Sequence, residues 1–421
     1  MTSFAELGVR TRTLESLGRL GITEPNAVQR EALPGLLGGG DAVIEAPTGS
    51  GKTLAFAIPV VERLRGHRPG GPRALVVGPT RELCQQVASV IAALDRELHV
   101  AVLYGGVGYG AQWHALSSGA DIVVGCPGRI LDLISVQRRA SFARVEYLVL
   151  DEGDEMLDSG FAHDVESIIA LCPDRSRRQT ILASATMPDW VERMIDRHLR
   201  APLRVRVAQE AAPDLEHGIL GVADELRLEA LVTLLRQQPA GAGTIVFTRT
   251  KHGAKKLTRK LEGLSLRVVE LQGNLSQNAR DRSIASFREG EADVLVATNV
   301  AARGLDVPRV SLVVNYELPE SALWLTHRIG RTARNGACGR AVTLLSATDA
   351  DQWHKLQRGG APHLRRLHSE PLLQRGEWLY LTEAEALAAT PAPVRGGSPG
   401  RPRYPAGSFR PRRQAPRRSA A

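Results

Sequence analysis

Features common in membrane and secreted proteins are absent from this sequence. Its 421 residues are 43% hydrophobic, yet no run approaches the ~18 apolar residues that a membrane-spanning helix needs. The opening segment MTSFAELGVR lacks the apolar region of a secretory signal peptide. The four cysteines have no metal-site spacing and fit reduced thiols: Cys84, Cys126, Cys172 and Cys338. We therefore expect a cytoplasmic protein with no membrane partner.

Lysine is scarce throughout, and acidic residues are missing from the last part of the chain. The sequence has 6 Lys against 48 Arg and a formal net charge of +9. Residues 391–421 hold eight Arg and no Lys, Asp or Glu, so 9 − 8 leaves about +1 for residues 1–390. Their Pro, Gly and Ser content predicts a disordered tail. Such a basic tail is typical of contact with nucleic acid, although a general bias toward Arg would explain Arg in place of Lys.

One stretch, residues 41–53 (DAVIEAPTGSGKT), predicts a phosphate-binding loop. A short apolar run precedes a glycine-rich turn, and Gly51-Lys52-Thr53 then opens a segment typical of a helix. Gly49 and Gly51 would let backbone N–H groups turn toward phosphate oxygens. Lys52 would reach the β- and γ-phosphates, and the Thr53 hydroxyl would hold Mg²⁺. The alternative is a strand–helix turn without a ligand, which the complete Gly-Lys-Thr in this context disfavours.

Short apolar strands alternate with helices up to residue 207, which predicts a parallel sheet covered on both faces. In such a sheet the loops at the carboxyl ends of the strands carry the chemistry. A strand ending in VLDE (149–152) would place Asp151 to hold Mg²⁺ through water and Glu152 to orient the attacking water. Arg81 and Arg129, beside helix N-termini, indicate contacts to a nucleic-acid backbone, although each alone could be an ordinary turn.

The alternation of strands and helices restarts after a stretch that lacks it. The chain therefore divides into an N-terminal nucleotide-binding domain (1–207), a linker (208–220), a second parallel α/β domain (221–350), an extension (351–390) and the tail (391–421). The second domain has no phosphate loop of its own. Its segment HRIGRTAR (327–334) carries three Arg in seven residues, which would either supply charge to the γ-phosphate or form a solvated helix face.

Taken together, these stretches resemble the DEAD-box family of ATP-dependent RNA helicases, including its bacterial members. The resemblance runs from about Phe4 to Ser346 and keeps the family's motif order. It implies two tandem RecA-like domains that bind ATP, Mg²⁺ and RNA. It also implies RNA-stimulated ATP hydrolysis coupled to unwinding of RNA duplexes or remodelling of RNA–protein complexes. The partner would be single-stranded or short duplex RNA, with ribosomal or RNA-decay components as further candidates.

The resemblance also implies a role for individual residues. The ATP site would comprise Phe4, Gln29, Ala46, Pro47, Thr48, Gly49, Ser50, Gly51, Lys52, Thr53 and Asp306. The planar amide of Gln29 also suits the edge of an adenine. Catalysis would use Lys52, Asp151, Glu152, Arg331 and Arg334, with Thr53 and Asp151 (via water) at Mg²⁺. RNA would contact Pro79, Thr80, Arg81, Gly106, Pro127, Gly128, Arg129, Thr250, Gln277, Arg280 and Thr298. Coupling between the domains would use Asp154, Ser184, Thr186, Arg303, His327 and Arg328.

Three positions depart from the family's pattern. Gly153 stands in place of the Ala of Asp-Glu-Ala-Asp, which loosens the backbone after Glu152 but removes no acid, so we expect activity to survive. Cys126 replaces a Thr before Pro-Gly-Arg and lacks a hydroxyl donor to RNA. Asn299 replaces an Asp, drops one charge near RNA, and should do little harm.

Two other functions compete with the helicase. An ATP-gated RNA clamp with little unwinding can lack a water-positioning acid, whereas this chain carries Glu152. A DNA translocase is disfavoured by the adenine-reading element and by the full motif set.

Overall fold

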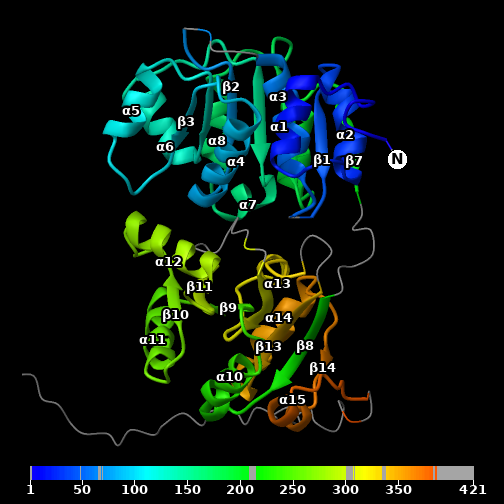
Figure 1. The fold of residues 1–421 in the computed structure, drawn as a ribbon, viewed down its shortest axis with the longest axis vertical. Helices are drawn as coiled ribbons and strands as arrows, with labels where there is room; N and C mark the ends of the chain where they lie inside the picture. Colours follow the sequence, from blue (N-terminus) through cyan, green and yellow to red (C-terminus); the bar gives the residue numbers. More distant parts are fainter. Residues whose placement is uncertain are drawn as a thin grey trace, which may run out of the picture. The chain divides into compact units, whose positions relative to one another are not determined.

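Two sheets organise the computed structural model, one at the centre of each of two lobes (Figure 1). The first lobe is the described part of residues 2–207, and the second is the described part of residues 215–381. The structure describes residues 2–47, 49–64, 68, 70–207, 215–299, 307, 309–333, 338–382 and 385. Among the predicted functional residues, Thr48, Arg303, Asp306, Arg334 and the tail (391–421) lie outside these ranges.

Every strand pairing in the first sheet is parallel, as predicted, and the strand order is β3-β4-β2-β5-β6-β1-β7. The strands are β1 (Ala42–Glu45), β2 (Ala74–Val77), β3 (Val100–Leu103), β4 (Ile122–Gly125), β5 (Tyr147–Asp151), β6 (Gln179–Ser184) and β7 (Leu203–Arg206). The helices are α1 (Thr11–Arg19), α2 (Ala27–Leu37), α3 (Lys52–Leu64), α4 (Arg81–Leu94), α5 (Gly110–Ser117), α6 (Pro127–Leu131), α7 (Gly153–Asp158), α8 (Ala162–Ala170) and α9 (Asp189–His198).

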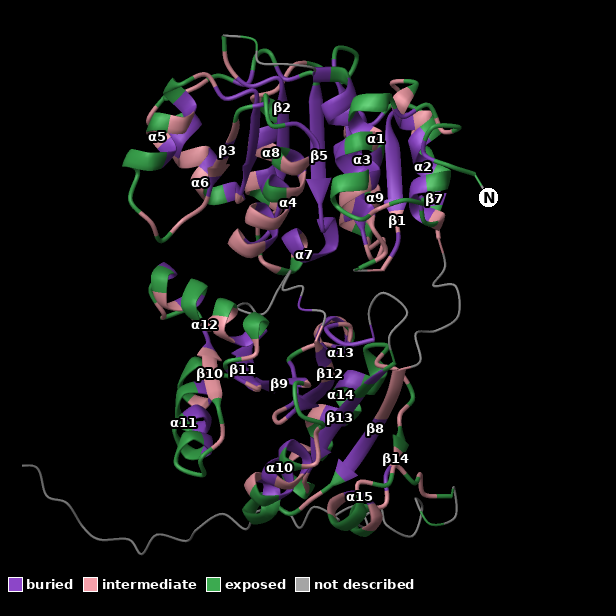
Figure 2. Cartoon of the chain, viewed as in Figure 1, coloured by how far each residue is buried: buried purple, intermediate pink, exposed green. Residues whose placement is uncertain are grey.

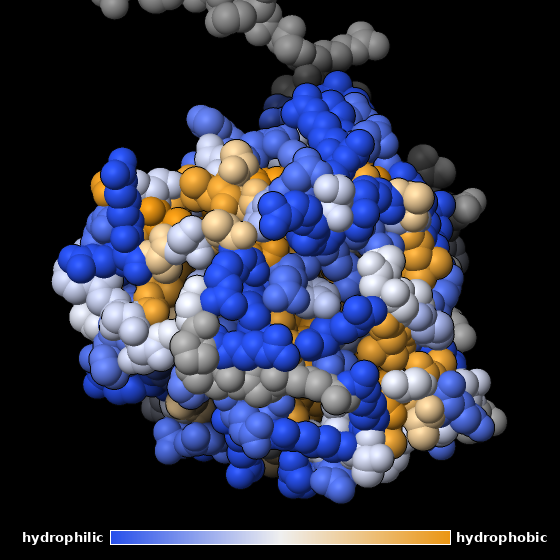
Figure 3. Space-filling view, turned by 90° about the horizontal axis from the view of Figure 1, so that it is seen from above, coloured by the Kyte–Doolittle hydropathy of each residue, from blue (hydrophilic) through white to orange (hydrophobic). Residues whose placement is uncertain are grey.

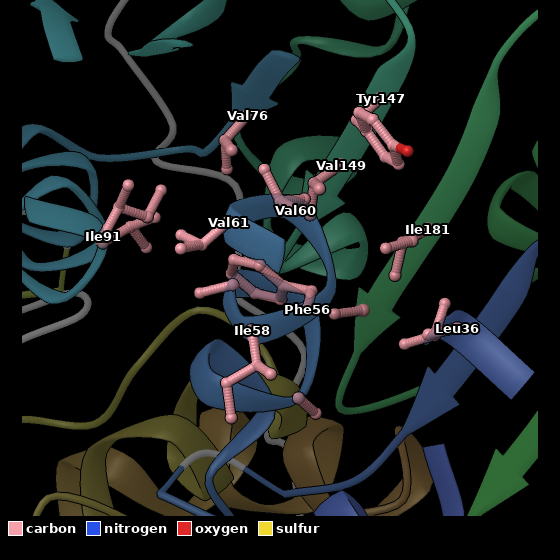
Figure 4. Close-up of a cluster of buried hydrophobic side chains, with 14 of the residues drawn as sticks. Leu36, Phe56, Ile58, Val60, Val61, Val76, Ile91, Tyr147, Val149 and Ile181 are labelled. Atoms are coloured by element: carbon pink, nitrogen blue, oxygen red, sulfur yellow. The ribbon is translucent and has the colours of Figure 1, made fainter. Parts of the chain in front are cut away.

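Helices cover both faces of this sheet, so its central strands are apolar on both sides. Along β2, Ala74 and Val76 belong to one hydrophobic cluster, whereas Leu75 and Val77 belong to another. The first cluster takes its helical side chains from α1, α2, α3 and α4, with Phe56 of α3 among them (Figure 4). Burial is concentrated in the strands and on the inner sides of the helices (Figure 2). This two-sided burial is why the strands read as continuous apolar runs in the sequence.

The strand order separates two groups of loops at the carboxyl edge of the first sheet. The loops after β1, β5 and β6 follow three adjacent strands and hold the phosphate loop, the Asp151–Asp154 turn and the Ser184–Thr186 turn. The loops after β3, β4 and β2 follow three adjacent strands on the other side of β5. The fold thus places the phosphate loop and the Asp151–Asp154 turn close together, with the first-lobe loops predicted to bind RNA after the neighbouring strands.

The second sheet is also parallel throughout, in the order β10-β11-β9-β12-β13-β8-β14. Its strands are β8 (Leu215–Gly221), β9 (Gly243–Thr248), β10 (Val268–Leu271), β11 (Val294–Thr298), β12 (Val310–Asn315), β13 (Gly339–Leu345) and β14 (Arg365–Arg366). Its helices are α10 (Arg227–Arg236), α11 (Lys251–Glu262), α12 (Gln277–Glu289), α13 (Ala322–Ile329), α14 (Ala350–Arg358) and α15 (Ser369–Arg375). Two sheets of this kind confirm the predicted fold class.

The structure differs from the sequence expectation at both ends of the second lobe. Residues 215–220 were expected in the linker, but they belong to β8, which pairs with β13 along its whole length. Residues 208–214 lie outside the described residues. The extension also joins the second sheet, because β14 pairs with β8 and the side chains of Leu367 and Leu372 enter the lobe's core.

The face of the molecule drawn in Figure 3 is largely hydrophilic. In Figure 3, hydrophobic side chains gather in small separate groups among hydrophilic ones. None of the helices in the described ranges is long and apolar enough to cross a membrane.

Candidate functional site

The phosphate loop has a backbone that only glycine adopts easily. Gly49 and Gly51 have φ angles of 84° and 85°, in the left-handed region, and α3 begins at Lys52 directly afterwards. A Cβ atom on Gly51 would lie 2.1 Å from Nδ2 of Asn26. The turn predicted from the sequence is therefore present, and its second glycine is required by the close approach of α2.

The start of α2 holds the phosphate loop in place. Asn26 and Gln29 form a reciprocal capping box, and Nδ2 of Asn26 donates to the carbonyl of Ser50 at 2.8 Å. Nε2 of Gln29 donates to the carbonyl of Gly51 at 3.3 Å. Gln29, predicted to read adenine, is thus bonded to the loop itself, and Phe4 is packed in the hydrophobic core. Asn26 was missed by sequence reasoning, since its role depends on this contact.

Lys52 points back into the loop that precedes it. Its Nζ donates to the carbonyl of Ala46 and, at 3.2 Å, to that of Pro47. Burial lowers the pKa of Lys52, while the nearby carboxylates of Asp151 and Glu152 oppose that shift. A buried cation held by carbonyl groups beside two acids is suited to meeting the oxygens of a polyphosphate.

Asp151 is the last residue of β5, Glu152 follows it directly, and both are buried. Burial, followed by the charge of Glu152, raises the pKa of Asp151 to about 7. Burial, followed by the charge of Glu155, raises the pKa of Glu152 to about 8. Glu152 also has φ 52° and ψ 56°, a left-handed conformation that is uncommon for a residue with a side chain. Perturbed acids and backbone strain of this kind cluster at functional sites.

Two polar groups at this site lack partners among the described residues. Oγ of Ser50 and Oε2 of Glu152 are buried and accept or donate no hydrogen bond there. Buried polar atoms are normally satisfied, so these two fit a polar ligand. Within the described ranges, no cluster of three or more His, Cys, Asp or Glu could ligate a metal alone.

A hydrogen-bonded bridge joins α7 to the end of β6. Oδ2 of Asp154 accepts from the backbone N–H of Thr186 at 2.9 Å and from its hydroxyl at 2.7 Å. Oγ of Ser184 accepts from the Asp154 N–H at 3.1 Å and donates to the Thr186 carbonyl at 2.8 Å. Three of the predicted coupling residues are thus brought into direct contact.

The first-lobe residues predicted to contact RNA lie at the ends of β2, β3 and β4. Pro79 and Thr80 precede α4, where Thr80 caps the helix by accepting from Leu83 N–H at 3.3 Å. The Arg81 guanidinium lies against Gly106, where an added Cβ would come within 2.5 Å of its Nη1. Pro127, Gly128 and Arg129 form the first turn of α6.

Arg129 is held by an aromatic pair that sequence reasoning missed. Its guanidinium carbon lies 4.3 Å from the ring centre of Tyr109, and Tyr109 stacks on Trp113 with ring centres 5.5 Å apart. The hydroxyl of Tyr109 donates to Asp132 at 2.7 Å. The only sequence signal was two aromatic residues four positions apart on a helix, beside the Gly-Gly turn.

In the second lobe, the residues predicted to contact RNA follow the adjacent strands β10, β11 and β9. Thr250 caps α11, and Thr298 is the buried last residue of β11. Oε1 of Gln277 accepts from Nη1 of Arg81 at 2.8 Å, and Arg280 Nε donates to Glu82 at 3.0 Å. Glu82 was not predicted, because its partner lies 198 positions away in the sequence.

The arginine-rich segment has two kinds of contact. Nδ1 of His327 lies 3.2 Å from Oε1 of Glu155, and the charge of Arg331 opposes the upward shift in the pKa of Glu152. Arg328 instead donates to Asn299 at 2.6 Å, to Asn315 at 3.2 Å and to the Glu317 carbonyl at 2.6 Å. Burial lowers the pKa of Arg328 to about 9. Its hydrogen bonds within the described residues therefore stay in the second lobe, although it was predicted to couple the lobes.

Known protein families match both lobes. Residues 26–194 match the family model described as DEAD/DEAH box helicase, and residues 226–336 match the helicase conserved C-terminal domain. The chain is 41% identical over 367 residues to the chloroplastic DEAD-box ATP-dependent RNA helicase 3A of Zea mays. The aligned region covers 85% of this chain and 49% of the maize protein. This chain thus spans about half the length of that curated relative.

Solved structures match over most of the chain. S. cerevisiae Dbp5 bound to RNA and ADP BeF3 superposes with a TM-score of 0.78 at 27% identity, covering 88% of this chain and 97% of that one. A DEAD box protein from the hyperthermophile Methanococcus jannaschii has a TM-score of 0.53 at 33% identity, covering 87% of this chain and 99% of that one.

Proposed function

We propose, since this chain belongs to the DEAD-box family of helicases, that it is an RNA-stimulated ATPase. The cycle of ATP binding and hydrolysis would separate short RNA duplexes or remodel RNA–protein complexes. Single-stranded or short duplex RNA is its substrate in this proposal, and ATP with Mg²⁺ drives the cycle. Support comes from the phosphate loop, the buried acid pair and the neighbouring loops at the carboxyl edge of the first sheet.

Nucleotide binding would use the phosphate loop from Ala46 to Thr53. Lys52 would exchange its hydrogen bonds to the carbonyls of Ala46 and Pro47 for hydrogen bonds to the β- and γ-phosphates. The phosphate oxygens are the stronger acceptors for its ammonium group because they are negatively charged. Free N–H groups at the start of α3 would add to this attraction. Phe4, Gln29 and Asp306 would contact the adenine and ribose.

Hydrolysis would depend on the two acids at the end of β5. Mg²⁺, held by Thr53 and through water by Asp151, supplies charge neutralisation at the phosphates when bound. Glu152 would orient the attacking water, while Arg331 and Arg334 would stabilise negative charge at the γ-phosphate. The Asp154–Ser184–Thr186 bridge would relay changes at this site to the loops that bind RNA.

RNA binding would follow the phosphate backbone over the loops after β2, β3 and β4 in the first lobe, and after β9, β10 and β11 in the second. Positively charged and N–H-rich loops contact phosphates rather than bases, so we expect little sequence preference from these residues. His327, Arg328 and Arg303 would help couple this surface to the nucleotide.

The observation that carries the proposal is Glu152. It is buried, its backbone is left-handed, and its Oε2 has no partner in the described part of the chain, while Lys52 of the phosphate loop lies close enough to affect its pKa. The carboxyl group of Glu152 also faces that of Glu155, which raises its pKa, and a purely structural acid would be expected to have a better partner for its second oxygen. The presence of an acid that could orient the attacking water also disfavours a clamp that binds ATP without hydrolysing it.

The test is steady-state ATP hydrolysis with no nucleic acid, with single-stranded RNA, and with DNA of the same sequence. We expect RNA to raise the rate at least about tenfold and DNA to leave it near the basal rate. Equal rates in all three would contradict the proposal, and equal stimulation by DNA would favour a DNA translocase. Displacement of one strand from a short RNA duplex then distinguishes a helicase from a clamp.

We further propose a cytoplasmic location and ribosomal or RNA-decay particles as the partner class. The support is the family membership and the eight Arg of residues 391–421, which suit RNA-rich assemblies. Crosslinking and sequencing of bound RNA in cells identifies the target.

A further inference from the structure

Two cysteines far apart in the sequence meet beside the loops proposed to bind RNA. Cys84 lies in the first turn of α4, and Cys126 is the residue directly before α6. Their Sγ atoms are 3.8 Å apart, although 42 positions separate them. The contact arises because β2, which leads into α4, is the neighbour of β4, which leads into α6.

The two thiols differ in exposure. Cys84 is buried in the hydrophobic cluster under α4, with 1% of its surface exposed, whereas Cys126 is half-buried at the edge of the same cluster. Cys126 can therefore meet a small oxidant, while Cys84 meets mainly Cys126. This is the usual arrangement of a reactive thiol next to a resolving one.

We propose that Cys84 and Cys126 form an oxidation site, at which hydrogen peroxide produces an intramolecular disulfide that restrains the RNA-facing loops and lowers RNA stimulation. Formation of the bond does not depend on the proposed function. The effect on RNA stimulation rests on it.

The chemistry balances with peroxide as the two-electron oxidant. Cys126 loses its thiol proton and the thiolate attacks one oxygen of hydrogen peroxide; the O–O bond breaks, Cys126 sulfenic acid forms, and the leaving hydroxide takes up the released proton as water. The sulfur of Cys84 then attacks the sulfenic sulfur, an S–S bond forms, and the hydroxyl leaves as a second water after taking the Cys84 proton. The protein loses two hydrogen atoms overall, and an added dithiol returns them.

The surroundings fit this order of events. A hydrogen bond with Cys126, followed by burial, raises the pKa of the Cys84 thiol well above its ordinary value. Cys84 therefore remains a thiol at neutral pH and reacts second, when the sulfenic acid is already next to it. The proximity of the two sulfurs replaces the nucleophilicity that the buried thiol lacks.

The bond would act on both loops because each sulfur belongs to a residue that borders one of them. A disulfide needs the sulfurs about 2 Å apart, so the present gap of 3.8 Å must close by nearly half. Cys84 is fixed in a core helix, whereas Cys126 directly precedes Pro127, Gly128 and Arg129. A disulfide would therefore tie this turn to the core helix, and a displacement of about 1 Å in groups that position a reaction can cost about 10²-fold in rate.

The first experiment detects the bond itself in the full chain. Cys172→Ser and Cys338→Ser remove the other two thiols, and this protein is treated with hydrogen peroxide and then with a thiol-blocking reagent. We expect the mass to fall by two hydrogens and trypsin to release peptide 82–96 linked to peptide 97–129. Adding Cys84→Ala should abolish the linked peptide, and Cys126→Ser serves as a second control in case the core variant folds poorly. Absence of the linked peptide, with blocked or overoxidised Cys126 instead, overturns the proposal.

The second experiment measures the consequence. ATP hydrolysis with and without single-stranded RNA is compared before oxidation, after oxidation and after reduction with dithiothreitol. We expect RNA stimulation to fall at least about threefold on oxidation and to return on reduction, with the RNA-independent rate unchanged. A linked protein with full RNA stimulation overturns the regulatory effect. Reduced protein without RNA stimulation overturns the proposed function instead, and the linked peptide still decides whether the disulfide forms.

Discussion

Glu152 has an environment that favours its protonated form in the folded protein. Burial raises its pKa to about 8, against an ordinary value of 4.5. A raised pKa means that the folded state binds the proton more tightly than the unfolded chain does. The associated stability is fully present below pH 4.5 and is lost as the pH rises through about 8.

Glu152→Gln should therefore gain stability relative to the parent protein as the pH rises. Glutamine cannot ionise, so the difference in the free energy of unfolding should be small near pH 5 and should grow in favour of the variant up to about pH 8.5. Urea unfolding across this range measures it, with Glu225→Gln at an exposed position as the control, expected within about 0.5 kcal/mol at every pH. A difference that does not change with pH would show that the carboxyl of Glu152 ionises normally in the fold.

Gly153 and Gly51 differ in how strongly their surroundings and backbone angles require glycine. Replacing each of them by alanine tests this difference. A Cβ on Gly153 would lie 3.7 Å from Leu182 and 3.8 Å from Oγ of Ser184, both ordinary contacts. Gly153→Ala should thus stabilise α7 by roughly 0.5–1 kcal/mol and keep ATP hydrolysis within a few-fold.

Gly51→Ala should have the opposite outcome, because its Cβ would overlap Asn26 and its φ of 85° is strained for alanine. We expect its ATP affinity to fall at least about tenfold, a change of about 1.4 kcal/mol in binding free energy. Thermal unfolding and ATP titration measure both variants. Loss of hydrolysis in Gly153→Ala would mean that this turn requires glycine when nucleotide is bound.

At the scale of the elements, α15 is a structural part of the second lobe. Leu372 of α15 is fully buried in its core, whereas Leu379, seven positions later, is 49% exposed. Leu372→Ala should cost about 2–5 kcal/mol of unfolding free energy, which is a large share of the stability of a typical domain. Leu379→Ala is the matched control and should change it by less than about 1 kcal/mol. Equal effects in urea unfolding would show that α15 packs elsewhere in solution.

Most elements could be predicted from the sequence, and the exceptions have a physical cause. The strand that leads into the phosphate loop and the strand that ends at Asp151 are buried on both faces. Their continuous apolar runs therefore predict buried strands clearly. β8 is different, because Gly218 sits where a Cβ would come within 2.6 Å of Leu367. This close approach requires a glycine, and the resulting segment LEHGILG looks like a linker.

The site was predictable where the chemistry lies within one motif, and not where it joins distant elements. The apolar strand, the glycines and the following Lys52-Thr53 together indicated the turn at Gly49 and Gly51. The contacts of Asn26 with Ser50 and of Glu82 with Arg280 depend on how α2 and α4 pack, and no local pattern reports that. The same is true of Cys84 and Cys126, whose contact follows from the order of two strands.

At the scale of the whole molecule, the charge of the chain is concentrated in residues 391–421, which lie outside the described residues. Each Arg that neutralises a phosphate of single-stranded RNA should contribute about 0.7 to the slope of log affinity against log salt. Eight such contacts set an upper limit of roughly 5–6. Removing residues 391–421 should weaken RNA binding and flatten this slope, while ATP affinity stays unchanged. Identical slopes with and without the segment would assign its charge to another partner.

The central claim is that Glu152 and the phosphate loop form one ATP-hydrolysing site, and single-turnover hydrolysis with RNA present tests it most directly. Glu152→Gln should keep its affinity for ATP and RNA but hydrolyse bound ATP at least about 10²-fold more slowly, as for loss of a positioned acid–base group. Lys52→Ala provides the contrast, since it should weaken ATP binding itself. Hydrolysis by Glu152→Gln at the rate of the parent protein would contradict the account.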